Sequence, residues 1–153
     1  MMRKLLVIFG LLPMLAMAEV KDLYWEDMVP SGYIAPDQNV SHDGDSMAQM
    51  NLDAPVVQEL DGQQVRIPGF VVPLEGDDDK LTEFLLVPYF GACIHVPPPP
   101  PNQIVYVKFE KGTPVESLYD AVWITGTLST KGWSGDIATV GYSLQGVKVE
   151  AYE

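Results

Sequence analysis

The stretch NQIVYVKFE, residues 102–110, shows the alternation that decides the fold class. Its two alternating sets of positions hold Ile104, Tyr106 and Lys108 on one side and Val105, Val107 and Phe109 on the other. Successive side chains of a β-strand point to opposite faces of the sheet, so a period of two is typical of a strand. The stretch therefore predicts a strand with a buried apolar face.

Four more segments of the chain carry the same kind of signal. They are residues 64–74, 81–90, 119–130 and 137–153, which are rich in branched and aromatic residues and bounded by turn residues. Residues 113–120 predict one helical turn between strands. Five strands with one short helix predict a mainly β protein, a small five-stranded OB-like barrel. A small β-sandwich is the alternative.

Glycines and aromatic residues refine this expectation. Gly69 and Gly126 lie inside predicted strands, where they fit the bends that closing a barrel requires. Trp123 is expected inside the barrel. The short apolar set Leu23, Trp25 and Met28, which lies before the first predicted strand, is expected to dock on the core.

The N-terminus predicts export. Residues 1–18, MMRKLLVIFGLLPMLAMA, combine a basic start, an apolar core too short to span a bilayer and an A-x-A cleavage site. The predicted organisation is a signal peptide (1–18), an extended N-terminal segment (19–55) and a β-barrel domain (56–153), one domain overall. The expected location is the periplasm, reached by the general secretion pathway, with no membrane insertion after cleavage.

The charge of the chain excludes one class of partner. The formal net charge is −12, and removal of Arg3 and Lys4 with the signal would bring it to −14. Nucleic acid is a poor partner, because duplex binding depends on neutralising phosphates with Lys and Arg. Cations or a basic protein surface would be attracted, although the acidity could also serve only solubility.

The single cysteine lies close to a histidine in VPYFGACIHVPPPPPN, residues 87–102. On an extended segment Cys93 and His95 would point the same way, within reach of one ion such as Zn²⁺. Five prolines, residues 97–101, would form a polyproline rod that fixes this geometry. Structural zinc sites almost always have four ligands, so His42 in the acidic loop SHDGD is a third candidate ligand.

Other interpretations of this region stay open. Cys93 could be a buried small apolar residue and His95 a hydrogen-bonded structural one. A thiol enzyme would need His95 to activate Cys93, yet no helix start or nucleophile elbow is present to help. Tyr89 and Phe90 are more often core residues than parts of a binding groove. Residues 77–79, DDD, lack the spaced ligands of a calcium loop and predict a solvated turn.

Four segments together resemble a known family. They are LYWEDMVP (23–30), LDGQQVRIPGFVVPLE (60–75), EFLLVPYFGACIHVPPPPPNQIVYV (83–107) and VWITGTL (122–128). They are similar to an uncharacterised family of proteobacterial periplasmic proteins, classed as a domain of unknown function. The resemblance implies a gene neighbourhood with a MacB-like ABC transporter and zinc-linked periplasmic proteins, and hence a role in metal homeostasis.

The sequence and the resemblance together lead to one expected function. We expect a periplasmic protein that binds or handles a transition metal without catalysis, as an accessory to an envelope ABC transporter, with zinc as the metal. Cys93, His95 and His42 are its predicted ligands. The alternative is a non-catalytic protein-binding adaptor in which Cys93 and His95 are structural. A thiol enzyme that uses Cys93 is the third hypothesis.

Overall fold

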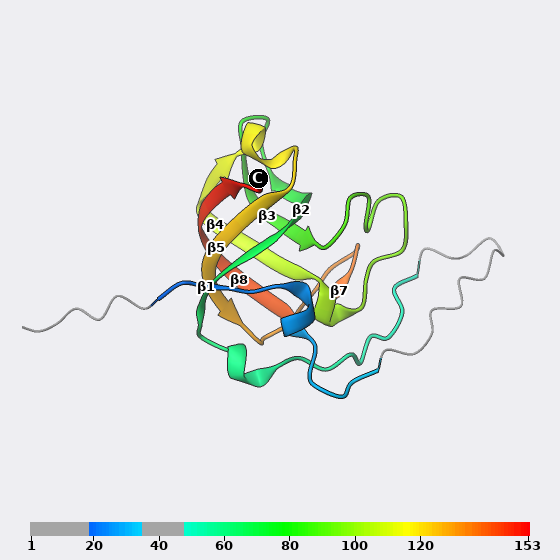
Figure 1. The fold of residues 1–153 in the computed structure, drawn as a ribbon. Coiled ribbons are helices and arrows are strands. Elements are labelled where there is room, and N and C mark those ends of the chain that lie inside the picture. The colour runs from blue at the N-terminus through cyan, green and yellow to red at the C-terminus, as the bar shows by residue number, and fades with distance from the viewer. Residues whose placement is uncertain (1–18, 35–47) are drawn as a thin grey trace, which may run out of the picture.

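The computed structural model describes residues 19–34 and 48–153, and it is mainly β (Figure 1). The strands are β1 (Lys21–Asp22), β2 (Gln64–Gly76), β3 (Lys80–Val87), β4 (Val105–Pro114), β5 (Val122–Ser129), β6 (Trp133–Ser134), β7 (Thr139–Val140) and β8 (Tyr142–Ala151). The described part of the chain also has four short 3₁₀ helices: η1 (Trp25–Met28), η2 (Gln58–Leu60), η3 (Pro101–Gln103) and η4 (Val115–Leu118). The predicted five long strands and helical turn are confirmed.

The five long strands close into a barrel. Their order is β2-β3-β4-β8-β5, and β5 pairs back onto β2. All of these pairs are antiparallel except β4–β8, which is parallel. The order and closure agree with an OB-like Greek-key barrel. The sandwich alternative is wrong, because pairing of β2 with β5 removes the open edges that two separate sheets would have.

The barrel interior holds the main apolar core. Alternate side chains of each strand enter it, and Ile67, Phe84, Val107, Ile124 and Leu144 are all at most 1% exposed. Alternation also explains one wrong prediction. Val122 and Ile124 point inward, so Trp123 between them lies on the outer face of β5, half-buried, where the Arg66 guanidinium covers its ring at 4.5 Å from the centroid.

Gly126 lies where the barrel needs a bend. The pairing of β5 with β8 shifts register between Thr125 and Gly126. A Cβ atom at Gly126 would overlap the backbone oxygen of Gln145. The close approach of two backbones at this bulge therefore excludes a side chain, as expected from the glycine inside the strand.

The N-terminal segment completes the core, as predicted. Leu23 and Met28 are fully buried in the barrel core, and Trp25 packs against it. The Trp25 indole Nε1–H donates a hydrogen bond of 2.7 Å to the carbonyl oxygen of Pro68 in β2. Burial of these side chains stabilises the barrel by removing apolar surface from water.

Tyr142 joins two chain segments to the barrel. Its hydroxyl donates to the carbonyl oxygen of Met28 at 2.8 Å and accepts a hydrogen bond from the backbone N–H of Val57 at 2.7 Å, and its side chain is fully buried. Burial raises the pKa of this phenol.

Replacement of Tyr142 by phenylalanine would leave both of those backbone groups unpaired inside the protein. We expect Tyr142→Phe to lower the free energy of unfolding by about 1–3 kcal/mol, since each orphaned buried group costs its desolvation energy. Urea denaturation measures this. The control is Tyr119→Phe, at a side chain that is 74% exposed. Equal stability of the two variants would contradict the role assigned to Tyr142.

A second apolar cluster lies outside the barrel. The outward side chains Val72 of β2 and Leu85 of β3, with Ile104 just before β4, pack under the β6–β7 hairpin and the β3–β4 connection. Tyr106 and Trp133 stack at its margin with ring centroids 4.8 Å apart. Among the described residues, the structure has no helix of the length and apolar character that a membrane crossing needs.

Candidate functional site

The connection between β3 and β4 contains the predicted site, and it projects from the side of the barrel next to β7 (Figure 1). We call residues 88–96 the apolar loop. The sequence from 84 to 107 contains no Asp, Glu, Lys or Arg, in a chain where 20% of residues are charged. The loop therefore lacks the solvated charges that usually cover exposed surface.

The backbone of the apolar loop forms one compact turn. The N–H groups of Ile94, His95 and Val96 all donate to the carbonyl oxygen of Gly91, at 3.2, 2.8 and 3.4 Å. Gly91 and Cys93 have φ values of 84° and 65°. A left-handed conformation is uncommon for a residue with a Cβ and has an energetic cost that the surrounding structure must offset. The turn is thus closed by its own hydrogen bonds.

This turn corrects the predicted geometry of Cys93 and His95. The two residues do not lie on an extended segment, because the positive φ values reverse the chain and bring the following amides back to Gly91. Cys93 is half-buried against the outer cluster, whereas His95 is exposed. The argument that strand alternation aligns the two side chains is therefore wrong.

The proline run supports the loop by packing rather than as a free rod. Pro98, Pro99 and Pro101 are buried, and Pro101 already begins η3. The side-chain amide of Gln49 donates to the carbonyl oxygens of Pro99 (2.8 Å) and Thr139 (2.7 Å) and accepts from the Thr139 N–H (2.7 Å). The run is thereby held between the N-terminal segment and β7.

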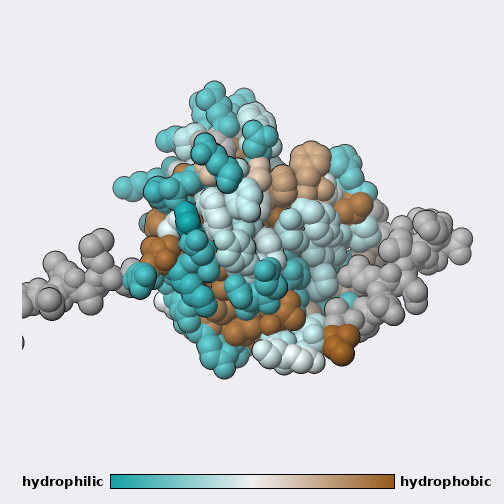
Figure 2. All heavy atoms as spheres, in the orientation of Figure 1, coloured by the Kyte–Doolittle hydropathy of each residue, from teal (hydrophilic) through white to brown (hydrophobic). Residues whose placement is uncertain are grey.

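Four large apolar side chains of the loop face solvent. Phe90 is 75% exposed, Ile94 54%, Tyr89 45% and Val96 41%. The buried Ala92 and the half-buried Cys93 anchor the tip, together with the edge contact of Phe90 with Phe70 of β2, whose ring centroids lie 6.0 Å apart. Figure 2 shows brown, hydrophobic spheres at the surface on the upper right, the side on which the loop projects in Figure 1.

The sequence pattern assigns the loop aromatics to the core, and this prediction is wrong for Tyr89 and Phe90. The signal in the sequence that indicates their exposure is the long uncharged stretch around Tyr89, Phe90 and Gly91. This stretch is longer than β3 and contains more apolar side chains than one strand can bury. Grouped exposed apolar side chains mark interaction sites far more often than scattered ones do. The loop is therefore the best candidate functional surface.

The environment of Cys93 does not activate its thiol. Burial raises the pKa of Cys93 to about 11, whereas reactive cysteines have lowered pKa values. Burial, and then the negative charge that Cys93 would carry as a thiolate, raise the pKa of the neighbouring Tyr89 phenol. At neutral pH the thiol is protonated, so it is a poor nucleophile and must lose a proton before it can bind a metal.

The predicted metal ligands are only partly placed. His42 lies outside the described residues, so its distance from Cys93 and His95 is not defined. Within residues 19–34 and 48–153, no group of three or more His, Cys, Asp or Glu side chains could hold a metal ion. Two donors from one turn do not complete a zinc site, and zinc binding stays a prediction that requires further ligands.

The aspartates at residues 77–79 form a turn, as predicted. The Asp77 carboxylate accepts hydrogen bonds from the backbone N–H groups of Asp79 (2.9 Å) and Lys80 (2.8 Å). These bonds hold the pKa of Asp77 below its usual value. The carboxylate is used to close the β2–β3 hairpin.

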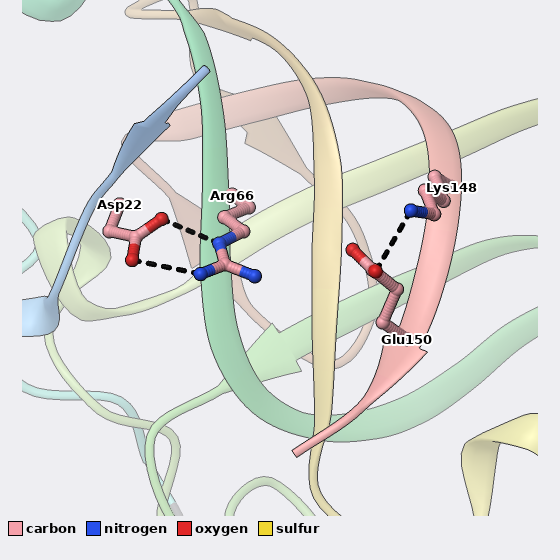
Figure 3. A network of polar contacts seen from close by, with 4 residues as sticks. All are labelled: Asp22, Arg66, Lys148 and Glu150. Carbon is pink, nitrogen blue, oxygen red and sulfur yellow. Dashed lines mark hydrogen bonds and ion pairs between the residues drawn. The ribbon is translucent and has the colours of Figure 1, made fainter. Parts of the chain in front are cut away.

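A polar network on the outer face of the barrel is the other candidate site, and Figure 3 shows how its four side chains lie. Arg66 of β2 donates to both carboxylate oxygens of Asp22 in β1, at 2.5 and 2.9 Å. Lys148 and Glu150 pair along β8 at 2.8 Å. Each cation already has a carboxylate partner, so the network attaches β1 to the barrel and offers no free charge for a ligand.

Comparison with known proteins places the chain in a family. A family model described as a protein of unknown function (DUF3299) matches residues 21–151. The chain belongs to the DUF3299 family. A crystal structure of a DUF3299 family protein from Pseudomonas aeruginosa PAO1 is similar to it, with 44% sequence identity, a TM-score of 0.78, and coverage of 88% of this chain and 97% of that one. No curated protein matches.

The DUF3299 match agrees with the coarse part of the resemblance, a family of unknown function that spans nearly all of the predicted mature chain. It gives no activity, metal or partner for either protein. The surface of this DUF3299 protein is therefore the best indication of its function.

Proposed function

We propose that this chain is an exported, non-catalytic binding protein that docks on a partner protein through the apolar loop. The observation that carries the proposal is a set of four exposed apolar side chains, Tyr89, Phe90, Ile94 and Val96, on a turn closed by its own hydrogen bonds. A preformed apolar surface loses little conformational entropy on binding. Aromatic side chains of this kind are typical anchors of protein interfaces.

A partner protein fits the charge of the chain better than a lipid surface does. Loops that bind membranes usually combine apolar residues with Lys or Arg, which contact anionic headgroups. No Lys or Arg lies between residues 84 and 107, and the whole chain carries a net charge of −12. Export to the periplasm and the link to an envelope transporter belong to this proposal and rest on the predicted signal and the family resemblance.

The proposal predicts a position-specific contact in cells. A photoreactive amino acid at Phe90 should give one discrete protein adduct when the full chain is expressed and irradiated. The matched control is Val147 on β8, which is 67% exposed but lies on another element, and it should give none. Adducts of equal yield and mass from both positions, or none from Phe90, would contradict docking through the loop.

Binding to lipid vesicles tests whether the apolar loop docks on a membrane instead of a protein. Purified chain should not co-sediment with vesicles of phosphatidylethanolamine and phosphatidylglycerol. Co-sedimentation that is lost in Phe90→Ser would replace the proposal by membrane binding.

Metal handling is the second candidate. The observation that favours it is that one turn contains both Cys93 and His95, with the imidazole exposed. Zinc would be the metal, because zinc binds sulfur and nitrogen donors, whereas hard cations such as calcium and magnesium prefer oxygen donors. The raised pKa of Cys93 opposes binding, because the thiolate is the ligand. Docking on a partner protein through the apolar loop, in contrast, does not require deprotonation of the Cys93 thiol.

A further inference from the structure

A groove of about 340 Å³ lies between the β2–β3 hairpin and the β6–β7 hairpin, over the same outer apolar cluster on which the apolar loop packs. The side chains that define it are Leu74, Glu75, Glu83, Trp133, Asp136 and Ile137. Leu74 and Trp133 pack on the outer apolar cluster and form an apolar floor, while the three carboxylates contribute the rim.

The groove and the apolar loop belong to one surface. Phe70 contacts Phe90 of the loop, and Phe70 and Leu74 point to the same outer face of β2, where both pack on the outer cluster. Four residues along a strand span about 13 Å. One partner could therefore contact the loop and the groove at the same time, since a standard protein interface is wider than this distance.

The rim of the groove carries three carboxylates, and one cation, Lys108, lies near them. Glu83 pairs with Lys108 at 2.8 Å. Glu75 and Asp136 are exposed and take part in none of the three ion pairs found in the described part of the chain. The field reaches the neighbouring phenol: burial, the Glu83 hydrogen bond and the charges of Glu83 and Glu75 raise the pKa of Tyr106 to about 12.

We infer that this groove receives a lysine or arginine side chain of the partner protein on which the apolar loop docks. The inference rests on the proposed function and names the chemistry of the partner. A long basic side chain combines an apolar stem with a cationic head. The stem matches the floor of Leu74 and Trp133, and the head matches Glu75 and Asp136 at the rim. The net charge of −12 attracts such a basic surface from a distance.

Nuclear magnetic resonance can test the groove without the partner. The probes are two short peptides with a central arginine or lysine among uncharged residues, and a third with citrulline in its place. Titration into the ¹⁵N-labelled full chain should shift the indole N–H signal of Trp133, assigned with Trp133→Phe, while the signal of Trp123 stays fixed. Citrulline has the shape of arginine without its charge and should produce no shift.

Two double variants test the role of the carboxylates, one at the groove and one as its control. Glu75→Gln with Asp136→Asn should weaken binding of the arginine peptide about tenfold, the effect of losing about 1.4 kcal/mol of binding free energy. Glu26→Gln with Glu59→Gln removes the same charge from exposed positions away from the groove and should change affinity less than about twofold. Equal weakening in both variants, no Trp133 shift, or an equal shift with citrulline would overturn the inference.

Crosslinking in cells distinguishes failure of this inference from failure of the proposed function. A photoreactive residue at Ile137, which is 40% exposed at the groove, should give an adduct of the same partner mass as one at Phe90. An adduct from Phe90 without one from Ile137 would overturn the groove inference and leave docking through the loop intact. No adduct from either position would overturn both.

Discussion

Phe84→Ala is expected to lower the free energy of unfolding by about 3–5 kcal/mol, while Phe90→Ala should change it by less than about 1 kcal/mol. Phe84 is fully buried in the barrel and stacks on Phe109, with ring centroids 5.9 Å apart. Its loss removes apolar burial and leaves a cavity that the closed barrel cannot collapse. Phe90 is 75% exposed and makes one edge contact with Phe70.

Urea denaturation of the two variants measures this difference, with the slope of the transition as a check on two-state behaviour. The same chemical change is made at two phenylalanines of one chain, so composition cannot explain a difference. A large loss of stability in Phe90→Ala would mean that the apolar loop is a structural element, and the proposal of a docking surface would lose its basis.

The barrel could be predicted from the sequence because its strands carry local signals. The alternation from Val105 to Phe109 marks one inward face, and the same face is observed in β4. Closure was indicated by Gly126, where a bulge brings two backbones together. The face of Trp123 was not predictable from its hydrophobicity, because register along β5 places Val122 and Ile124 inside and leaves the indole outside.

The candidate site was harder to predict because its geometry depends on a few backbone angles. An i, i+2 spacing has a defined meaning only on a regular strand, and the left-handed conformations of Gly91 and Cys93 remove that regularity. The burial of Cys93 is decided by residues distant in sequence, such as the outer cluster of β2 and β3. The exposure of Tyr89 and Phe90 also depends on tertiary structure. From sequence alone, aromatic residues are assigned to the core, and only the fold shows that other side chains already fill it.

The groove illustrates the same dependence on tertiary structure. Glu75 and Asp136 are far apart in the sequence, and the local sequence around each predicts only an ordinary exposed turn. They line one groove because the β6–β7 hairpin folds over the outward face of β2 and β3. This groove is the place at which we propose that a basic side chain of a partner binds.

Iodoacetamide should alkylate Cys93 in the folded protein about a hundredfold more slowly at neutral pH than it alkylates the same cysteine in the unfolded chain. The thiolate is the reactive form, and burial raises the pKa of Cys93 from its ordinary value of 9.0 to about 11. A pKa that is higher by about two lowers the thiolate fraction at neutral pH about a hundredfold. The thiol is protonated in the folded state at neutral pH. The alkylation rate of the folded protein should therefore rise about tenfold per pH unit until the pH approaches the pKa of about 11.

Mass spectrometry of the reduced protein, sampled with time in buffer and in guanidinium chloride, measures both rates. A folded rate close to the unfolded one would restore the thiol-enzyme hypothesis, since an accessible and activated thiol is what nucleophilic catalysis requires.

Zinc provides the second arm of the experiment. If Cys93 and His95 bind zinc, the metal must displace the thiol proton, and Co²⁺ in its place should give a thiolate charge-transfer band that Cys93→Ser abolishes. Slow alkylation without such a band leaves Cys93 as a structural residue that packs on the outer cluster, and the exposed side chains beside it as the part of the loop that we propose contacts a partner.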